Sequence, residues 1–280
     1  MTAPAVAVRR RTDRTALVCA AVLGLIVLIT LCAPFLAPHD PVTGDLAGVL
    51  QSPSAAHPFG TDELGRDLLS RVLHGGRGAL TITAISSVLT ALIAVVLAIA
   101  AATLGPAVDA VAGRLGDIAL AVPTIVIAIV LLTFAGNSPA ILVTVMVLGG
   151  WVPTFRLVRA SARATLALPY VDAARIAGVR PGRIALRHVV PAVAPILVVS
   201  ATASASVVLV SLSSLNYLGL GLQPPIPDWG QMVAAGQAKL STAPWLSLIP
   251  GGVLAVTVFC LQMVGDAVSD RLGGNEENTR

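Results

Sequence analysis

The chain alternates between long apolar runs and shorter polar segments. An α-helix needs about 20 apolar residues to cross a hydrocarbon layer of roughly 30 Å. The alternation of apolar and polar residues that a membrane β-strand would need does not appear in these runs. We therefore predict six membrane-spanning helices, at Thr15–Ala37, Ala79–Leu104, about Gly113–Phe134, Pro139–Phe155, about Ala192–Tyr217 and about Trp245–Val268.

Two of these spans need separate comment. The third carries Arg114 and Asp117 near its start and is interrupted by Pro123, which a spanning helix tolerates where its neighbours satisfy the freed carbonyl. The first is an apolar run longer than the 7–15 residues usual in a signal peptide, and it lacks a cleavage site between small residues. We interpret it as a retained membrane anchor.

Composition supports a membrane protein. Only 11% of the residues are charged, against about 25% in ordinary soluble domains, while 56% are hydrophobic and the mean hydropathy is +0.88. A soluble fold of 280 residues could not hide so many apolar side chains beneath a polar surface. The predicted fold class is an all-α integral membrane protein.

Basic residues predict the orientation in the membrane. With the N-terminus inside, cytoplasmic segments would hold fourteen of the 18 lysines and arginines, and external segments four. Both termini are therefore predicted to be cytoplasmic. The net charge of +4 is spread between apolar runs, so it gives little support for nucleic-acid binding. The resulting division is a tail at 1–14, a first helix at 15–37, an extracytoplasmic loop at 38–78, a five-helix core at 79–268 that includes a cytoplasmic loop at 156–191, and a tail at 269–280.

The cytoplasmic loop has the punctuation of two short helices. Pro169 suits a first helical turn, and Asp172 near that end complements the helix dipole. Gly178 offers a stop for this helix, and Pro181 opens the next one. Pro191 is expected to end or kink that second helix.

The first of these short helices has a face of small side chains. Tyr170, Ala173, Ala174 and Ala177 follow helical spacing and share one face. Small residues let another surface approach closely, whereas a helix lying on lipid would show bulky apolar residues. A plain basic connector would explain the arginines of this loop but not its prolines, alanines and glycine.

The external loop carries acidic, basic and histidine residues. Asp67–Leu73 is predicted to be a short amphipathic helix leading into the second span. Asp62, Arg66 and Asp67 are expected to order the loop by pairing with one another or with glycine amides. The spacing of the loop histidines (His39, His57 and His74) matches no known metal site, so we predict no metal site and no catalytic residue in this chain.

The cytoplasmic loop resembles the "EAA" loop of ABC importer permeases. That pattern is Glu-Ala-Ala, three residues, glycine, and a proline nineteen positions after the glutamate. The matching positions here are Asp172, Ala173, Ala174, Gly178 and Pro191. Asp172 stands where the family has glutamate, and His188 and Val190 replace the usual isoleucine and leucine.

Two further segments resemble the C-type permease subunit of the dipeptide/oligopeptide/nickel subfamily. The first is the stretch from His57 to Gly75, whose candidate positions are Gly60, Thr61, Asp62, Gly65, Arg66 and Asp67. The second is Leu215–Gly221 with Pro224-Pro225 and Asp228-Trp229-Gly230. Together the three motifs cover nearly the whole chain after the N-terminal tail.

The resemblance implies a heteromeric machine with a type I importer fold. Its partners would be a second homologous permease, two ATPase subunits and an extracytoplasmic solute-binding protein. The short cytoplasmic helix, with Tyr170 and Ala177 beside the motif residues, would couple it to the ATPases. The chain has no Gly-x-x-x-x-Gly-Lys-Ser/Thr loop, so ATP and Mg²⁺ would be bound by partner subunits and this chain would hold no cofactor. The cargo would be di- or oligopeptides, with nickel or another metal chelate as the alternative.

Two other function classes compete with this interpretation. An intramembrane enzyme would need paired ionisable or nucleophilic groups deep in the membrane, and no span has an obvious deep His, Asp or Glu. The serines of the fifth span have no buried base to activate them, so helix packing is favoured over pathway lining. An autonomous channel would not explain the punctuated cytoplasmic loop.

Overall fold

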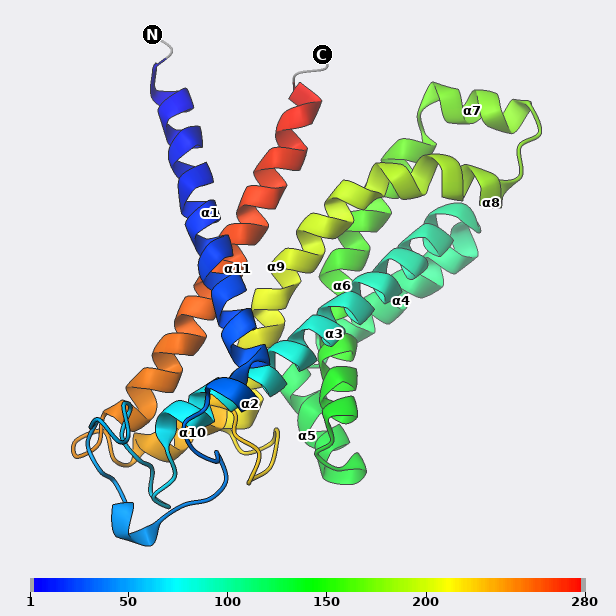
Figure 1. The fold of residues 1–280 in the computed structure, drawn as a ribbon. Helices are drawn as coiled ribbons and strands as arrows, with labels where there is room; N and C mark the ends of the chain where they lie inside the picture. The colour runs from blue at the N-terminus through cyan, green and yellow to red at the C-terminus, as the bar shows by residue number, and fades with distance from the viewer. Residues whose placement is uncertain (1–2, 278–280) are drawn as a thin grey trace.

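The computed structural model describes residues 3–277, with side chains placed for residues 14–271, and it is helical almost throughout (Figure 1). Five helices are long: α1 (Ala3–Leu31), α3 (Leu68–Thr103), α6 (Pro139–Leu166), α9 (Val190–Tyr217) and α11 (Trp245–Glu277). The shorter elements are α2 (Ala33–Leu36), the 3₁₀ turn η1 (Leu46–Gly48), α4 (Pro106–Ala121), α5 (Thr124–Ala135), α7 (Pro169–Ile176), α8 (Pro181–Ile184), the π-turn η2 (Ala185–Val189) and α10 (Trp229–Gln237).

The predicted third span is not one helix. Five helices of the described chain are long and apolar enough to cross a membrane, and α4 with α5 qualifies as a sixth only as a pair bent by 83°. The bend falls at Val122 and Pro123, because Pro123 has no N–H to continue the ladder and instead precedes the first turn of α5. The span predicted at about Gly113–Phe134 is therefore not one continuous helix but two helices that are broken at Pro123, the residue that interrupts it in the sequence.

Helix α6 is longer than predicted. It continues to Leu166 rather than ending at Phe155, so the predicted loop at 156–191 contains its last turns. The basic residues there pair with α4: Arg156 lies 2.8 Å from Asp117, and Arg159 and Arg163 both contact Asp109. These opposite charges let the arginines remain in the helix beside α4. The short helix expected at Asp67–Leu73 is the first part of α3. Helices α1 and α11 extend into the predicted N- and C-terminal tails. The remaining tail residues, Met1, Thr2 and 278–280, lie outside the described residues.

The centre of the molecule is the packing of α3 against α6 and α9. Small residues bring these helices close: Ala94 and Ala98 of α3 are fully buried, and a side chain at Gly149 of α6 would meet Thr124 at 2.3 Å. Large apolar side chains of α3, such as Val88 and Val96, point outward instead. This is the distribution that membrane helices use, since close approach of small residues replaces the hydrophobic effect between them.

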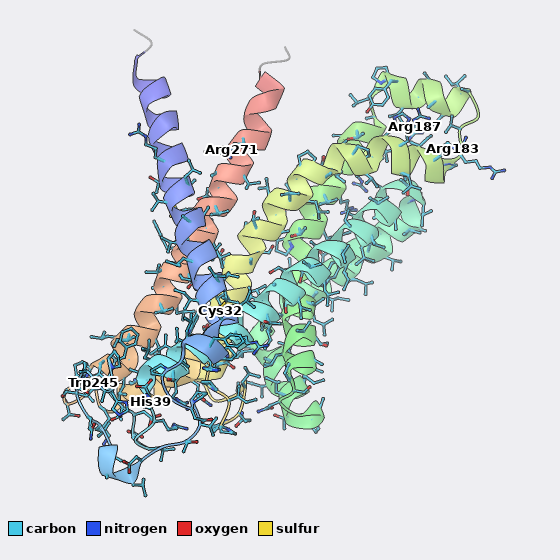
Figure 2. The ribbon with its side chains drawn as sticks, viewed as in Figure 1. Cys32, His39, Arg183, Arg187, Trp245 and Arg271 are labelled. Carbon is cyan, nitrogen blue, oxygen red and sulfur yellow. The ribbon has the colours of Figure 1, made fainter. Side chains whose placement is uncertain are left out.

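The two ends of the molecule carry different features. The start of α1, the end of α11 and the α7–α8 segment lie at one end, and the segment between α2 and α3, with α10, lies at the other (Figure 1). Figure 2 shows Arg183 and Arg187 at the first end, and His39 and Trp245 at the second. We call residues 37–67, between α2 and α3, the 37–67 loop. Helix α1 packs on α11 and α3, which ties the N-terminal helix to the bundle.

Candidate functional site

Helix α7 ends in the way its glycine predicts. Gly178 has φ +76°, the left-handed conformation that other residues adopt at a cost. The amide of Val179 donates to Ala174 O at 3.0 Å, and that of Gly178 donates to Arg175 O at 3.0 Å. This pair of bonds is the Schellman arrangement, which satisfies the last carbonyls of the helix and reverses the chain. The predicted stop at Gly178 is confirmed.

Helix α7 is fastened to the bundle by one side and open on the other. Val171 is fully buried in the cluster that contains Val158 and Ile184. Tyr170, Ala173 and Ala177 are exposed, and the Tyr170 ring lies 5.5 Å from that of His188. The small face therefore lies on the open side of a helix whose position is fixed from behind.

Two features of this segment differ from the expectation or were missed. Asp172 pairs with Arg175 within α7 at 2.8 Å, and both side chains are about half exposed. Ile176 is 88% exposed beside the small face. This exposed side chain adds an apolar contact to the same open surface. The sequence carries a signal for this, because Ile176 lies three residues after Ala173 and therefore on the same side of the helix as the small face.

Pro191 does not end the second short helix. Residues 181–217 run as one helical stretch, and Pro191 lies in the first turn of α9. Because proline has no N–H and its ring crowds the carbonyl four residues earlier, the preceding turn widens into the π-turn η2. The prediction that Pro191 would end the helix is wrong. The helix continues through Pro191, and its backbone is distorted only in the wider π-turn that precedes it.

The 37–67 loop is organised by Thr61 and two glycines. The Thr61 hydroxyl is fully buried, donates to Gly48 O and accepts from the Gln51 amide at 2.8 Å. Gly60 and Gly65 have φ +78° and +69°. A Cβ on Gly65 would lie 1.8 Å from Asp45 O, so only glycine fits there.

Asp62 is the charged centre of the loop. Its carboxylate accepts from the amides of Leu64 (2.9 Å) and Arg66 (3.0 Å) and from the Arg66 Nε at 2.7 Å. The buried Arg71 Nε lies 3.4 Å from the same carboxylate, and its Nη1 donates to Pro41 O at 2.9 Å. The expected pairing of Asp62 with Arg66 is confirmed.

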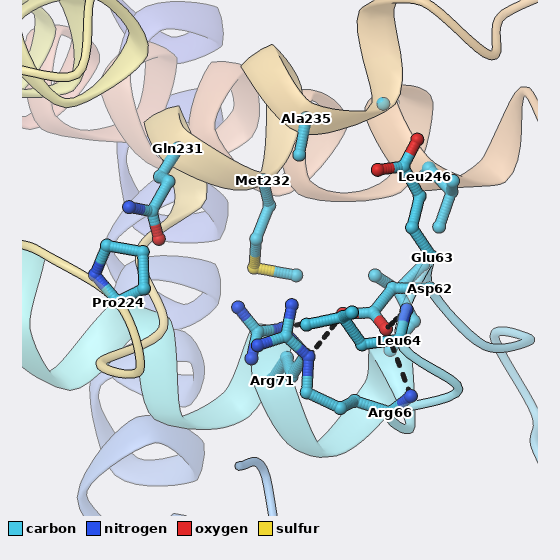
Figure 3. A pocket seen from close by; sticks show the side chains of 12 residues that line it. Asp62, Glu63, Leu64, Arg66, Arg71, Pro224, Gln231, Met232, Ala235 and Leu246 are labelled. Carbon is cyan, nitrogen blue, oxygen red and sulfur yellow. Dashed lines mark hydrogen bonds and ion pairs between the residues drawn. The ribbon is translucent and has the colours of Figure 1, made fainter. Parts of the chain in front are cut away.

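These charges line a hollow between the loop and α10. Figure 3 shows Arg66 and Arg71 beneath Met232 of α10, in a cavity of about 290 Å³ that Leu246 also lines. The hollow thus has a charged wall from the loop and an apolar wall from α10 and α11.

Asp67 pairs differently from the expectation. Among the described residues, its carboxylate pairs with no arginine side chain and no glycine amide; it accepts from Ser70 N at 2.8 Å and lies 2.9 Å from His57 Nδ1. Burial raises the pKa of Asp67, but the hydrogen bonds from Ser70 and His57 outweigh burial, so the pKa lies below its ordinary value. His74 lies apart from this group, with its Nδ1 2.9 Å from Ser70 O.

The Asp-Trp-Gly motif joins α10 to its neighbours. Asp228 caps α10 by accepting from the amides of Gly230 and Gln231. Trp229 is fully buried and donates its indole N–H to Val72 O of α3 at 2.8 Å. A side chain on Gly230 would meet Ser213 O of α9 at 2.3 Å. The cap, the buried indole and the close helix contact therefore explain why the fold needs each residue of this motif.

Burial raises the pKa of Asp228 from its ordinary value near 3.8 to about 6, against the two amide hydrogen bonds. Between pH 4 and 6 the folded protein then binds more protons than the unfolded one, so this group lowers stability as pH rises through that window. We expect Asp228→Asn, which keeps a capping side chain, to be more stable than wild type at pH 7, by on the order of 2 kcal/mol, with the gap closing towards pH 4. Thermal unfolding of both proteins at a series of pH values measures this. A gap that widens on acidification would contradict it.

The comparisons with known proteins identify the family. The model of the binding-protein-dependent transport system inner membrane component matches residues 92–274, and the N-terminal transmembrane domain of oligopeptide transport permease C matches residues 7–53. The chain is 35% identical to the Escherichia coli (strain K12) oligopeptide transport system permease protein OppC over 262 residues, which cover 93% of this chain and 87% of that protein. The chain belongs to this permease family.

Further relatives and a solved structure agree. The permease is 35% identical to the di/tripeptide transport system permease protein DppC of Pseudomonas aeruginosa (strain UCBPP-PA14), over 91% of this chain and 86% of that one. A chain of the inward-facing MetNI methionine ABC transporter superposes with a TM-score of 0.60 at 16% identity, covering 72% of the permease and 96% of that chain. The predicted family and fold class are confirmed.

Like its relatives, the permease is a transport subunit and not an enzyme. The serines of α9 fit a packing role. Ser204 bonds back to Ser200 O within the helix, and Ser206 Oγ lies 2.8 Å from Gln262 Oε1 of α11. A hydroxyl that joins two membrane helices is a common means of packing.

Proposed function

We propose that this permease works in the bacterial cell (plasma or inner) membrane with both termini and α7 on the cytoplasmic side. The distribution of lysine and arginine supports this orientation, as does the position of the start of α1, the end of α11 and the α7–α8 segment at one end of the molecule. The 37–67 loop and α10 would then face the extracytoplasmic side, and the outward apolar side chains of the long helices would face lipid.

The exposed small face of α7 is the observation that carries the coupling function. Ala173 and Ala177 would let α7 enter a groove of an ATPase subunit, with Ile176 as an apolar contact. Val171 and the turn at Gly178 hold the helix to α6, α8 and α9, so movement of the ATPase would be passed to these helices as a rigid body. Two ATPase subunits would bind ATP and Mg²⁺, and this chain would need no cofactor of its own.

A second homologous permease and a solute-binding protein complete the proposed assembly. The binding protein would dock over the 37–67 loop, whose charged and apolar hollow beside α10 is open on that end of the molecule. Delivery from there to a path between the two permeases would make the ATP-driven uptake directional.

The proposed cargo is a di- or oligopeptide, supported by the names of the relatives that match over most of the chain. Nickel or another metal chelate is the other outcome of the test. The ligand that co-purifies with the solute-binding protein, identified by mass spectrometry, decides between them.

The coupling function is tested at Ala173. A tryptophan there would hold α7 away from the groove by its bulk, while Ala173→Ser adds only a hydroxyl at the same exposed position. We expect Ala173→Trp to lower co-purification of the ATPase subunits at least tenfold and to abolish uptake, and Ala173→Ser to retain both. Wild-type association and uptake in Ala173→Trp would show that the ATPases bind elsewhere.

A further inference from the structure

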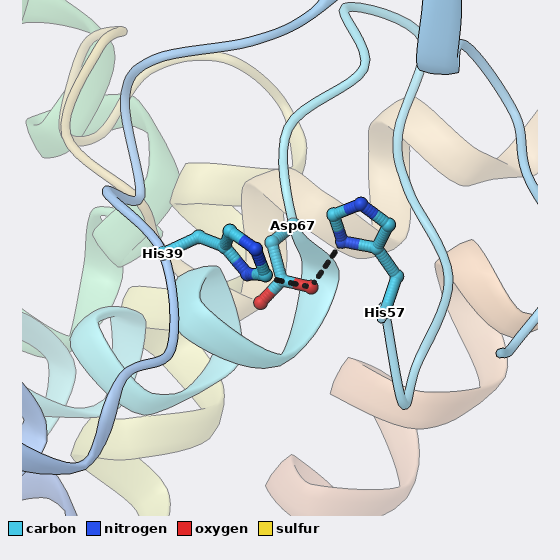
Figure 4. A group of neighbouring side chains, drawn as sticks. All are labelled: His39, His57 and Asp67. Atoms are coloured by element: carbon cyan, nitrogen blue, oxygen red, sulfur yellow. Dashed lines mark hydrogen bonds and ion pairs between the residues drawn. The ribbon is translucent and has the colours of Figure 1, made fainter. Parts of the chain in front are cut away.

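Three side chains of the 37–67 loop meet beside the start of α3. His39 follows α2, His57 lies in the middle of the 37–67 loop, and Asp67 caps α3. Figure 4 shows both imidazole rings turned towards the same carboxylate. The His57 Nδ1 and the His39 Nδ1 lie 2.9 and 3.8 Å from Asp67 Oδ1, and one ligand atom from each residue falls within 4.8 Å of the others.

These separations are compatible with a small tetrahedral ion. Bonds of about 2.0–2.2 Å from zinc to nitrogen and oxygen place neighbouring ligand atoms roughly 3.3 Å apart. The two measured distances fall on either side of this value. A hydrogen bond explains His57, but His39 at 3.8 Å is too far to make one. The centroids of the two imidazole rings lie 4.7 Å apart. An ion between the three groups would hold both rings at this carboxylate.

The surroundings hold the carboxylate and the His39 backbone in position. The second oxygen of Asp67 accepts from Ser70 N at 2.8 Å and from Ser70 Oγ at 2.7 Å, which leaves Oδ1 for the two imidazoles. The Ser70 hydroxyl in turn accepts from the His39 amide at 3.1 Å. Outer hydrogen bonds of this kind orient metal ligands and raise affinity.

The group borders a cavity of about 470 Å³, which leaves room for a water molecule as the fourth ligand. Asp40 and Asp45 also line the cavity, but each carboxylate is already engaged by nearby backbone amides. Two imidazole nitrogens and one carboxylate suit zinc and its neighbours in the first transition row, whereas Mg²⁺ and Ca²⁺ prefer oxygen ligands alone.

We propose that His39, His57 and Asp67 bind a divalent transition-metal ion, with zinc as the occupant. The ion fastens the segment after α2 and the middle of the 37–67 loop to the first turn of α3. This site is independent of the cargo and of the proposed orientation in the membrane.

The test is zinc binding to the full-length permease, purified with an affinity tag that contains no histidine and stripped with EDTA. Titration calorimetry with ZnCl₂ should show one site per chain, and excess MgCl₂ should not displace the ion. The decisive variant is His39→Asn, because the His39 ring is 44% exposed and its Nδ1 lies 3.8 Å from Asp67, so the change removes a proposed ligand without breaking a hydrogen bond to Asp67. We expect its affinity for zinc to fall at least tenfold, as for His57→Asn.

His74→Asn is the matched control, because His74 lies near the start of α3 but is not one of the three proposed ligands. It should bind zinc as wild type does. A four-coordinate visible spectrum after Co²⁺ addition should appear in wild type and His74→Asn and be lost in His39→Asn. Absence of a stoichiometric zinc site in wild type, or equal zinc binding by His39→Asn, would overturn the proposal and leave a hydrogen bond between His57 and Asp67.

Discussion

Replacing Gly178 by arginine is expected to abolish uptake while the permease still inserts in the membrane. The left-handed backbone there costs a non-glycine residue about 1–2 kcal/mol, which is too little to unfold the bundle or to detach α7, which the buried Val171 fastens to it. A Cβ on Gly178 would meet open space, so an arginine side chain projects outward into the surface that α7 offers to the ATPase. ATPase association should therefore fall together with transport.

Gly178→Asn is the matched control for this experiment, because asparagine tolerates positive φ and is much shorter than arginine. It should retain most of the association and uptake of wild type. The measurements are co-purification of the ATPase subunits and substrate uptake by cells, with permease abundance in the membrane as the reference. If Gly178→Arg matched wild type in both, the α7–α8 segment would be a connector without a coupling role.

Gly65→Ala is expected to disrupt the 37–67 loop. The new methyl would lie 1.8 Å from the Asp45 carbonyl oxygen in a backbone with φ +69°, and neither backbone can move without breaking the bond from Asp45 N to Gly65 O at 3.2 Å. Steric overlap with backbone and positive φ together put the expected loss at about 3 kcal/mol or more for the loop.

Gly48→Ala in the same loop serves as the control, because its Cβ would come no closer than 3.5 Å to the flexible end of Gln51. Limited proteolysis of the purified permease should cleave the loop of Gly65→Ala at least tenfold faster than wild type and leave Gly48→Ala unchanged. Equal cleavage of all three proteins would mean that the close packing of Gly65 against Asp45 does not hold the loop.

The helices and the family motifs could be predicted from the sequence because their signals are local. Apolar runs located the long helices, and Pro169 with Gly178 located α7. The end of α6 was not predicted, because arginine ends an apolar run without ending a helix, being itself a good helix former. In the fold, Arg156 and Arg159 continue α6 and pair with Asp117 and Asp109 of α4. The bend between α4 and α5 follows from Pro123, but its 83° angle depends on how both helices pack.

The group of His39, His57 and Asp67, which we propose as a metal site, could not be predicted from the sequence because the fold assembles it. The spacing of the histidines along the chain predicts no metal site. In the structure the third member of the group is Asp67 and not His74. The Asp67 side chain also caps the N-terminus of α3. Only the folding of the loop back onto α3 brings these groups together.

The most direct test of the account is site-specific photo-crosslinking in the assembled transporter. A photoreactive phenylalanine analogue at Ala173 of α7 should crosslink to an ATPase subunit, and the same analogue at the exposed Ser54 of the 37–67 loop should not. Mass spectrometry of the crosslinked bands identifies the partner at each position. An ATPase crosslink from Ser54, or none from Ala173 in an assembly that retains its ATPases, would contradict both the orientation and the coupling role of α7.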